Sequence, residues 1–214
     1  MEVEERFCLL RSEVEGELRE ILKDADLPLY NMIRYHLGWV DEHGRPCTAT
    51  RGKGIRPLLC LLACEGVGGE RSHAVPAAAA VELIHNFSLI HDDIEDESPL
   101  RRGRPTVWRI WGRAQAINAG DALHTLARLC LLRLESRSVE PRKIVEAIRF
   151  LDQTCLELCE GQYLDISFES RGDVDVEGYL GMIRLKTASL FRCSLELGAF
   201  LGTEDGGKIK GLGV

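Results

Sequence analysis

The amino-acid sequence predicts an all-α fold, and three features support that class. Apolar residues recur at spacings of three and four along most of the chain, which is the period of an amphipathic helix. Runs of alternating β-branched residues, which are typical of strands, are missing. No internal repeat and no linker-like stretch divides the 214 residues, so we expect one domain with a substantial core.

Six segments carry the helical period, and turn residues separate them. In chain order the segments are 7–22, 58–62, 75–90, 114–134, 144–158 and 179–201. Clusters of turn residues predict breaks at 41–44, 66–69, 98–105 and 171–173. Ser138 followed by Pro141 predicts a helix start, because proline is favoured in the first helical turn. The stretch 202–214 has five glycines and no amphipathic pattern, so we expect a loose end there.

The composition limits the class of protein. Hydrophobic residues make up 45% and charged residues 29% of the chain, as in ordinary globular domains. The formal net charge of −7 argues against general nucleic-acid binding, which usually requires a basic surface. No apolar run is long enough for a transmembrane segment, and the acidic, helical N-terminal stretch does not resemble a signal peptide.

Two cysteine pairs, Cys60 with Cys64 and Cys155 with Cys159, have the four-residue spacing of neighbours on one helical face. Both pairs lie among apolar residues and lack the CxxC spacing of zinc ribbons. We therefore expect reduced thiols in a hydrophobic core, which favours a cytoplasmic setting.

Polar side chains interrupt the core-facing stripes of three predicted helices. These polar members are His85, Ser88, Asp92, Asp96, Gln162, Asp165 and Lys186. Burying a charge is unfavourable unless it is paired or binds a metal, so the three stripes predict one shared polar cavity. The alternative is a set of structural ion pairs, for example Lys186 with Asp165.

The string DDIED at 92–96 is the most informative acidic stretch. Asp92 and Asp96 are four residues apart, so their carboxylates lie one helical turn apart on one face. Like charges this close repel unless a cation lies between them. Mg²⁺ prefers oxygen ligands and usually shares them with waters and substrate phosphates. The stretch therefore predicts a metal–phosphate site, with a solvated helix end as the alternative.

Two basic clusters flank this acidic stretch. Lys53 and Arg56 are three residues apart where a loop enters a predicted helix, and Arg101 and Arg102 follow the acidic residues directly. Arginine forks suit phosphate oxygens, and lysine supplies a point charge. Each cluster alone fits a solvated loop, but together with a buried acidic stretch they favour a phosphate-binding site.

Four motifs resemble those of trans-isoprenyl diphosphate synthases, the polyprenyl synthetase family, in its geranylgeranyl and farnesyl diphosphate synthase-like branch. GKGIRP at 52–57 resembles the GKRxRP motif, and ELIHNFSLIHDDIEDESPLRRGRPT at 82–106 resembles the first aspartate-rich motif with its flanks. GQYLD at 161–165 resembles GQxxD, and Lys186 with Thr187 resembles the later KT pair. The resemblance implies a bundle of long antiparallel helices around a central cavity.

The resemblance also implies roles at the allylic diphosphate. Mg²⁺ would be the cofactor, held by Asp92 and Asp96 with Asp93 in support. The remaining residues implied for this part of the site are Asp165 as a further metal ligand, Arg101 and Lys186 as diphosphate contacts, and Gln162 and Thr187 as lining residues. Catalysis would thus depend on Asp92, Asp93, Asp96 and Lys186.

A second diphosphate site is implied for isopentenyl diphosphate. Its residues would be Lys53, Arg56, His85 and Arg102. For His85 the alternative is an ordinary core histidine. The implied reaction is the head-to-tail condensation of isopentenyl diphosphate with an allylic diphosphate, in which diphosphate leaves an allylic carbocation and no protein nucleophile is needed.

Product length in this family is related to the residues just before the first aspartate, here Phe87 and Ser88. The bulk of Phe87 favours a short or medium all-trans product. The absence of a two-residue insertion between Asp93 and Asp96 resembles geranylgeranyl-type more than bacterial farnesyl-type enzymes. The resemblance also implies a homodimer.

The sequence departs from the family pattern after the KT pair. The second aspartate-rich motif is not found, because Glu196, Glu204 and Asp205 are the only later acidic residues. We therefore expect residues 1–214 to be one polyprenyl synthetase-like domain that lacks its C-terminal helices. A smaller departure is Gly54, where the family often has arginine.

Two other functions remain open at this stage. A non-catalytic regulatory subunit of a heteromeric synthase would explain the missing motif. A terpene cyclase also uses an aspartate-rich helix, but it has no need of a second diphosphate site, so Lys53, Arg56 and Arg102 count against it.

Overall fold

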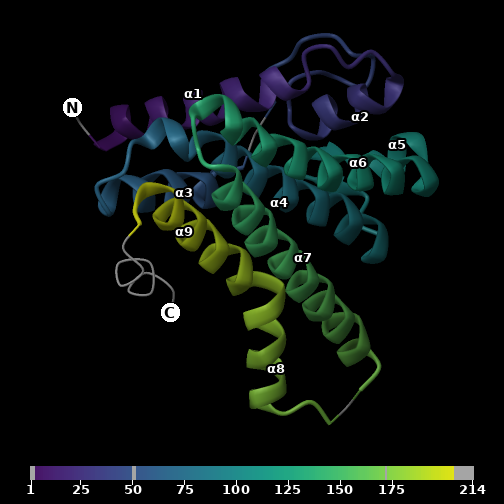
Figure 1. Cartoon of the computed structure of the whole chain (residues 1–214). Coiled ribbons are helices and arrows are strands. Elements are labelled where there is room, and N and C mark those ends of the chain that lie inside the picture. The colour runs from purple at the N-terminus through teal and green to yellow at the C-terminus, as the bar shows by residue number, and fades with distance from the viewer. Residues whose placement is uncertain (1–2, 50–51, 172, 205–214) are drawn as a thin grey trace.

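The computed structural model describes residues 3–49, 52–171 and 173–204, and helices dominate it (Figure 1). The longer helices are α1 (Val3–Ile21), α2 (Pro28–His36), α3 (Ile55–Gly66), α4 (Val75–Glu95), α6 (Arg113–Leu132), α7 (Pro141–Glu169), α8 (Val176–Ile183) and α9 (Ser189–Gly202). The shorter elements are η1 (Arg71–His73), β1 (Leu100–Arg101), β2 (Arg104–Pro105), α5 (Val107–Trp111), η2 (Arg133–Arg137) and η3 (Arg184–Ala188). The all-α prediction is confirmed.

Most predicted segments correspond to observed helices, and Pro141 opens α7 as expected. Two short helices, α2 and α5, were not predicted. The prediction of a bare turn at 98–105 was incomplete, because β1 and β2 pair there as a two-stranded hairpin. The predicted helix 179–201 was wrong in one respect, because the π-helical turn η3 separates α8 from α9. Gly202, the first residue of the expected loose end 202–214, still belongs to α9, and residues 205–214 lie outside the described residues.

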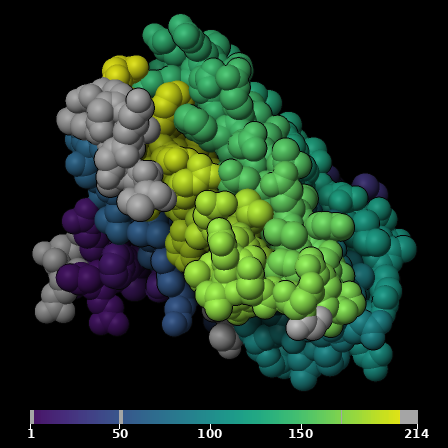
Figure 2. All heavy atoms as spheres, turned by 90° about the horizontal axis from the view of Figure 1, so that it is seen from below, coloured from purple at the N-terminus to yellow at the C-terminus, as the bar shows by residue number. Residues whose placement is uncertain are grey.

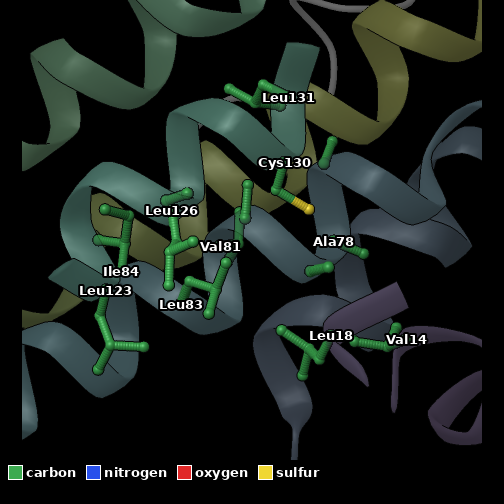
Figure 3. Packing of buried hydrophobic residues seen from close by; sticks show 14 of the residues in the cluster. Val14, Leu18, Ala78, Val81, Leu83, Ile84, Leu123, Leu126, Cys130 and Leu131 are labelled. Atoms are coloured by element: carbon green, nitrogen blue, oxygen red, sulfur yellow. The ribbon is translucent and has the colours of Figure 1, made fainter. Parts of the chain in front are cut away.

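Helix α4 lies at the centre of the core. Its first turns are small and apolar, and Ala77, Ala78, Ala79 and Ala80 are fully buried. A helix that is apolar on most sides is normally buried, and the small residues let neighbouring helices approach closely. Figure 3 shows Val81 and Ile84 of α4 beside Leu123 and Leu126 of α6. This packing fixes the segment that continues toward Asp92.

Helices α3 and α9 are in backbone contact. A methyl group at Gly198 would lie only 1.9 Å from the carbonyl oxygen of Cys60, so only glycine fits at this crossing. Cys60, Cys64 and Cys155 are buried free thiols, as predicted. The prediction was wrong for Cys159, which is exposed.

We expect Gly198→Ala to destabilise the protein by about 3 kcal/mol, since the added methyl group must separate two helix backbones. For a chain of this size that corresponds to a fall in Tm of roughly 6 to 12 °C. Gly16→Ala on α1 is the matched control, because no atom lies within 4 Å of its added methyl group. An unchanged Tm for Gly198→Ala in thermal melts would contradict the close packing of α3 against α9.

Helices α7 and α8 extend away from the core and are joined by the loop after Glu169 (Figure 1). Seen from below, they lie side by side at the front of the molecule (Figure 2). The cavity described below lies between α4, α7 and the turn η3. The described helices include none that is both long and apolar enough to cross a membrane.

Candidate diphosphate and metal site

A cavity of about 480 Å³ lies between the C-terminal half of α4, α7 and η3. Its wall contains eight of the side chains that the sequence predicts for the site. They are Arg56, His85, Phe87, Ser88, Asp92, Gln162, Lys186 and Thr187. The three helical stripes therefore do meet at one cavity, but Asp96 and Asp165, which the same stripes include, are not part of its wall.

Two carboxylates, Asp92 and Glu95, line this cavity, and Asp92 is the one that the sequence predicts for the site. Burial raises the pKa of Asp92 to about 6, and the charges of Asp96 and Glu95 act in the same direction, while Lys186 opposes them. The carboxylate is therefore held in an environment that disfavours its negative charge. A cation bound beside it would relieve this unfavourable charge.

Lys186 and Asp165 form an ion pair across α7 and η3, with Nζ 2.5 Å from Oδ2. Burial works to lower the pKa of Lys186, but the hydrogen bond to Asp165 and the charge of Asp92 outweigh it, and the pKa is raised. The ion pair named above as the alternative interpretation is thus present. Lys186 nevertheless lines the cavity, so it remains available to an anion there.

Asp96 caps the C-terminus of α4 and is exposed, with its N–H bonded to Asp92 O at 2.8 Å. Among the described residues, no group of three or more His, Cys, Asp or Glu side chains is close enough to hold a metal ion. The structure therefore does not bring Asp92, Asp96 and Asp165 into one ligand cluster. Mg²⁺ does not require three protein ligands, because it commonly binds one or two carboxylates and keeps waters and phosphate oxygens as its other ligands. Asp92 with Asp96 fits this donor set.

Arg56 carries a largely buried charge at the other side of the cavity. Burial lowers the pKa of its guanidinium, and its Nε is buried without a hydrogen-bond partner among the described residues. Its guanidinium lies 4.3 Å from the centre of the Phe191 ring, and Nη1 is 3.4 Å from His85 Nε2. In the described part of the chain no carboxylate lies within ion-pair distance of Arg56. A buried cation without an anion is unfavourable, so this group is suited to bind one.

His85 is neutral beside Arg56. Burial lowers its pKa to about 3, and the charges of Arg56, Arg102 and Arg101 lower it further in that order of size. An imidazole with such a pKa carries no charge at neutral pH. It can therefore accept from Arg56 or donate to a ligand without adding to the positive charge.

Asp93 points away from this cavity. It is 2% exposed, and Arg101 Nε donates to both of its oxygens at 2.9 Å. Burial raises the pKa of Asp93, and the bond to Arg101 opposes that rise. The pair fixes the β1–β2 hairpin to α4. Arg101 is thus engaged with Asp93 and does not line the cavity.

Arg102 lies at the tip of the same hairpin, with a φ of +52°, followed by Gly103 at +78°. Positive φ at both central residues is the geometry of a tight hairpin turn. The guanidinium reaches the loop before α3, where a methyl group at Gly52 would lie 2.7 Å from Arg102 Nη2. Gly52 therefore makes room for Arg102. Lys53 beside it is exposed and is not part of the cavity wall.

Gly54 opens α3 in a left-handed conformation, with φ of +60°. An arginine at this position would be strained, which gives a physical reason for the departure from the family motif.

The sequence analysis did not identify Glu95, which lines the cavity and accepts a hydrogen bond from Gln162 Nε2 at 2.7 Å. Its place within the acidic string 92–96, at the end of the aspartate-rich helix, was the available signal.

Phe87 forms the aromatic part of the cavity wall. Its ring centre lies 4.9 Å from that of His91 and 5.0 Å from that of His124 on α6. Ser88 beside it donates its hydroxyl to His85 O at 2.9 Å. Phe87 therefore separates the cavity from the α4–α6 interface.

An all-helical fold that gathers an acidic helix end and several cations around one cavity is the isoprenyl synthase architecture. The profile of the family described as polyprenyl synthetase matches residues 38–212. The chain belongs to the polyprenyl synthetase family.

Solved structures and curated relatives agree with this assignment. A polyprenyl synthetase from Streptomyces coelicolor A3(2) has a TM-score of 0.87 at 40% identity, over 95% of this chain and 59% of that chain. A geranylgeranyl pyrophosphate synthetase from Pyrococcus horikoshii Ot3 has a TM-score of 0.85 at 37% identity, over 98% and 61%.

Two mycobacterial relatives illustrate the range of products within the family. A (2E,6E)-farnesyl diphosphate synthase of Mycobacterium tuberculosis is 45% identical over 184 residues, which are 86% of this chain and 50% of the relative. A geranylgeranyl diphosphate synthase of the same organism is 41% identical over 202 residues, 94% of this chain and 57% of the relative. The chain therefore spans about half the length of the curated relatives it matches.

Proposed function

We propose that the protein condenses isopentenyl diphosphate head-to-tail with an allylic diphosphate in a Mg²⁺-dependent reaction. The observation that carries this proposal is that one cavity contains both a carboxylate and a guanidinium whose charged forms are disfavoured. Burial raises the pKa of Asp92 although the charge of Lys186 opposes the rise, and burial lowers the pKa of Arg56 although the charge of Glu82 opposes the fall. Two bound diphosphates and a divalent cation would compensate the charges of both side chains.

The allylic diphosphate would bind at the acidic end of the cavity. Asp92 and Asp96 would hold Mg²⁺, with Asp165 as a further ligand if it exchanges Lys186 for the metal. Asp93 would support Asp92 indirectly by anchoring Arg101, and Lys186 would contact the diphosphate. Gln162 and Thr187 would line this side of the site.

Isopentenyl diphosphate would bind at the basic end. Arg56 and His85 line the cavity, whereas Arg102 and Lys53 do not line it and would have to reach the diphosphate from the hairpin and from the loop before α3. Arginine forks and a neutral imidazole donor together suit diphosphate oxygens. The two substrates would then meet between Arg56 and Asp92.

Bound Mg²⁺ would supply charge stabilisation for the departing diphosphate. Lys186 would add positive charge where negative charge develops. Loss of diphosphate leaves an allylic carbocation, which the double bond of isopentenyl diphosphate attacks. A proton then leaves the new cation, and the released diphosphate is the base at hand. Phe87 and the apolar wall would keep water from the carbocation.

Phe87 and Ser88 would set the length of the product. The bulk of Phe87 beside His124 favours a short or medium all-trans chain. A homodimer and a cytoplasmic location belong to the same proposal, which rests on the family.

Incubation with Mg²⁺, isopentenyl diphosphate and an allylic diphosphate separates the possible functions. Chain extension, detected as a longer prenyl diphosphate, is the expected result. Binding without turnover would instead indicate a regulatory subunit. Hydrocarbon formed without incorporation of isopentenyl diphosphate would indicate a terpene cyclase, and either of these results would overturn the proposal.

Arg56→Gln should raise the KM for isopentenyl diphosphate about 100-fold, because charge-assisted hydrogen bonds to a phosphate are lost. The KM for the allylic diphosphate should change less than about 2-fold, since Arg56 lies away from the acidic end. Arg142→Gln, at an exposed position near the start of α7, is the control. Equal rises in both KM values in steady-state kinetics would count against two separate sites.

A further inference from the structure

Helices α3 and α9 lie side by side and run in the same direction (Figure 1). A methyl group at Gly198 would lie 1.9 Å from the carbonyl oxygen of Cys60, and one at Gly202 would lie 2.7 Å from that of Cys64. The contact thus advances four residues on both helices at once, so the helices are parallel. Their N-terminal ends therefore lie together, next to the site.

The ring of Phe191, in the first turn of α9, contacts the guanidinium of Arg56, in the first turn of α3. The guanidinium carbon lies over the ring, 4.3 Å from its centre. At this distance a cation is attracted by the negative face of an aromatic ring. Arg56 lines the cavity between α4, α7 and η3, whereas Phe191 does not belong to its described wall. Phe191 therefore acts on a ligand in this cavity only through Arg56.

A second uncharged group contacts the same guanidinium. Arg56 Nη1 lies 3.4 Å from His85 Nε2. A guanidinium has only donors, so the imidazole nitrogen accepts in this contact. Burial lowers the pKa of His85 to about 3, which leaves the ring neutral at neutral pH. His85 thus contacts Arg56 without changing the net charge of the pair.

Arg192, the residue after Phe191, is held in the opposite way. Its Nη2 lies 2.5 Å from Glu157 Oε2, so a carboxylate compensates its charge. Among the residues that the structure describes, no carboxylate lies within ion-pair distance of Arg56. The charge of Glu82 raises the pKa of Arg56 only from farther away, and burial outweighs it. Arg56 is therefore held in direct contact by uncharged groups.

This difference matters for anion binding. A carboxylate in the place of the Phe191 ring would also fix the guanidinium, but it would repel a diphosphate and compete with it for the same donors. An aromatic face attracts the cation and carries no net charge. A side chain that is already fixed loses less conformational entropy when its ligand binds. The ring thus orients Arg56 and leaves its charge available.

We propose that Phe191 is a positioning residue, which holds the Arg56 guanidinium for the diphosphate of isopentenyl diphosphate without neutralising it. The inference rests on the proposed function and adds a residue outside the four sequence motifs. Arg56 lies at the basic end of the cavity, away from Asp92. The effect of Phe191 should therefore fall on one substrate only.

Phe191→Leu and Phe191→Tyr test the role of the ring. We expect Phe191→Leu to raise the KM for isopentenyl diphosphate about 10-fold, the effect of losing a partly desolvated cation–π contact. The KM for the allylic diphosphate and kcat should change less than about 2-fold. Phe191→Tyr keeps the aromatic face and should stay within about 3-fold of the parent protein. Equal rises in both KM values, or a tyrosine variant as poor as the leucine variant, would overturn the inference.

Phe191→Glu tests whether the neutrality of the ring matters. The new carboxylate can pair with Arg56 and repel the diphosphate, so we expect the KM for isopentenyl diphosphate to rise about 100-fold. A KM below that of Phe191→Leu would show that a charged partner serves as well, and would overturn the inference.

Phe200→Leu is the matched control on the same helix. Phe200 is also partly buried, and its ring also lies under a cation, with Lys143 Nζ 5.4 Å from its centre. It does not line the cavity. Phe200→Leu should lower Tm about as much as Phe191→Leu does and leave both KM values unchanged. A rise in the KM for isopentenyl diphosphate in this control would mean that loosening α9 is sufficient, and would overturn the specific role of Phe191.

A binding measurement covers variants that fold but turn over poorly. Calorimetric titration with isopentenyl diphosphate should give about 10-fold weaker binding to Phe191→Leu than to the parent protein. Equal affinities would overturn the role of Phe191. No binding to the parent protein would instead reject the proposed function, so the two failures are distinguishable.

Discussion

Asp92→Asn should lower kcat about 10³-fold and at the same time stabilise the protein. The substitution keeps the shape of the side chain but removes the charge that would hold the cation at the allylic diphosphate. Loss of one pre-organised charged group of this kind commonly reduces turnover by two to three orders of magnitude, roughly. Steady-state kinetics with saturating substrates measures the effect.

The stability gain follows from the pKa of Asp92, which is raised to about 6 in the folded protein. An unfolded aspartate titrates near pH 3.9, roughly, so between these pH values the folded state binds more protons. Stability therefore falls as pH rises through this window, and the loss persists above pH 6. Allowing for solvent screening, Asp92→Asn should gain ~2 kcal/mol at pH 7.5 without Mg²⁺ and little at pH 4.

Asp24→Asn, at an exposed position between α1 and α2, is the control for both effects. It should leave kcat and the pH dependence of unfolding unchanged. A stable Asp92→Asn variant with full activity would show that Asp92 is not a metal ligand. A destabilised variant at pH 7.5 would show that its charge is already compensated within the protein.

Gly161→Ala should reduce kcat about 100-fold and destabilise the protein by about 2 kcal/mol. A methyl group at Gly161 would lie 2.3 Å from Lys186 N and 2.7 Å from Lys186 Cα. These are backbone atoms, so η3 must move away from α7, and Lys186 moves with it. The better helix propensity of alanine, worth about 1 kcal/mol, does not offset such a clash.

Gly181→Ala on α8 is the matched control, because nothing lies within 4 Å of its added methyl group. It should be as stable as the parent protein or slightly more so, with normal turnover. Thermal melts and initial rates on both variants make the comparison. Normal activity of Gly161→Ala would mean that the position of Lys186 does not limit catalysis.

The sequence predicts α4 well because local and global signals agree there. Small apolar residues at its start indicate burial, and the polar stripe from His85 to Asp92 correctly indicates a cavity. The roles of neighbouring residues are harder to predict. Asp92 and Asp93 are adjacent and chemically identical, yet one faces the cavity and the other binds Arg101. That difference depends on the hairpin, whose position the helical period does not encode.

Two other features depend on contacts between distant segments. The π-helical turn at Lys186 interrupts a pattern that reads as one continuous helix. This turn packs against Gly161 so closely that an added methyl group there would lie 2.3 Å from Lys186 N. Helix α2 has only nine residues, too few for a strong periodic signal. Helix α2 supports the β1–β2 hairpin, because the Tyr35 hydroxyl donates a hydrogen bond to Pro105 O at 2.8 Å.

Titration calorimetry with inorganic diphosphate, with and without Mg²⁺, tests the central claim most directly. The account predicts two binding events on the parent protein. One requires Mg²⁺ and is lost in Asp92→Asn, and the other persists without metal and is lost in Arg56→Gln. A single event that neither substitution weakens, or binding that ignores Mg²⁺ altogether, would contradict a cavity built for two diphosphates and a divalent cation.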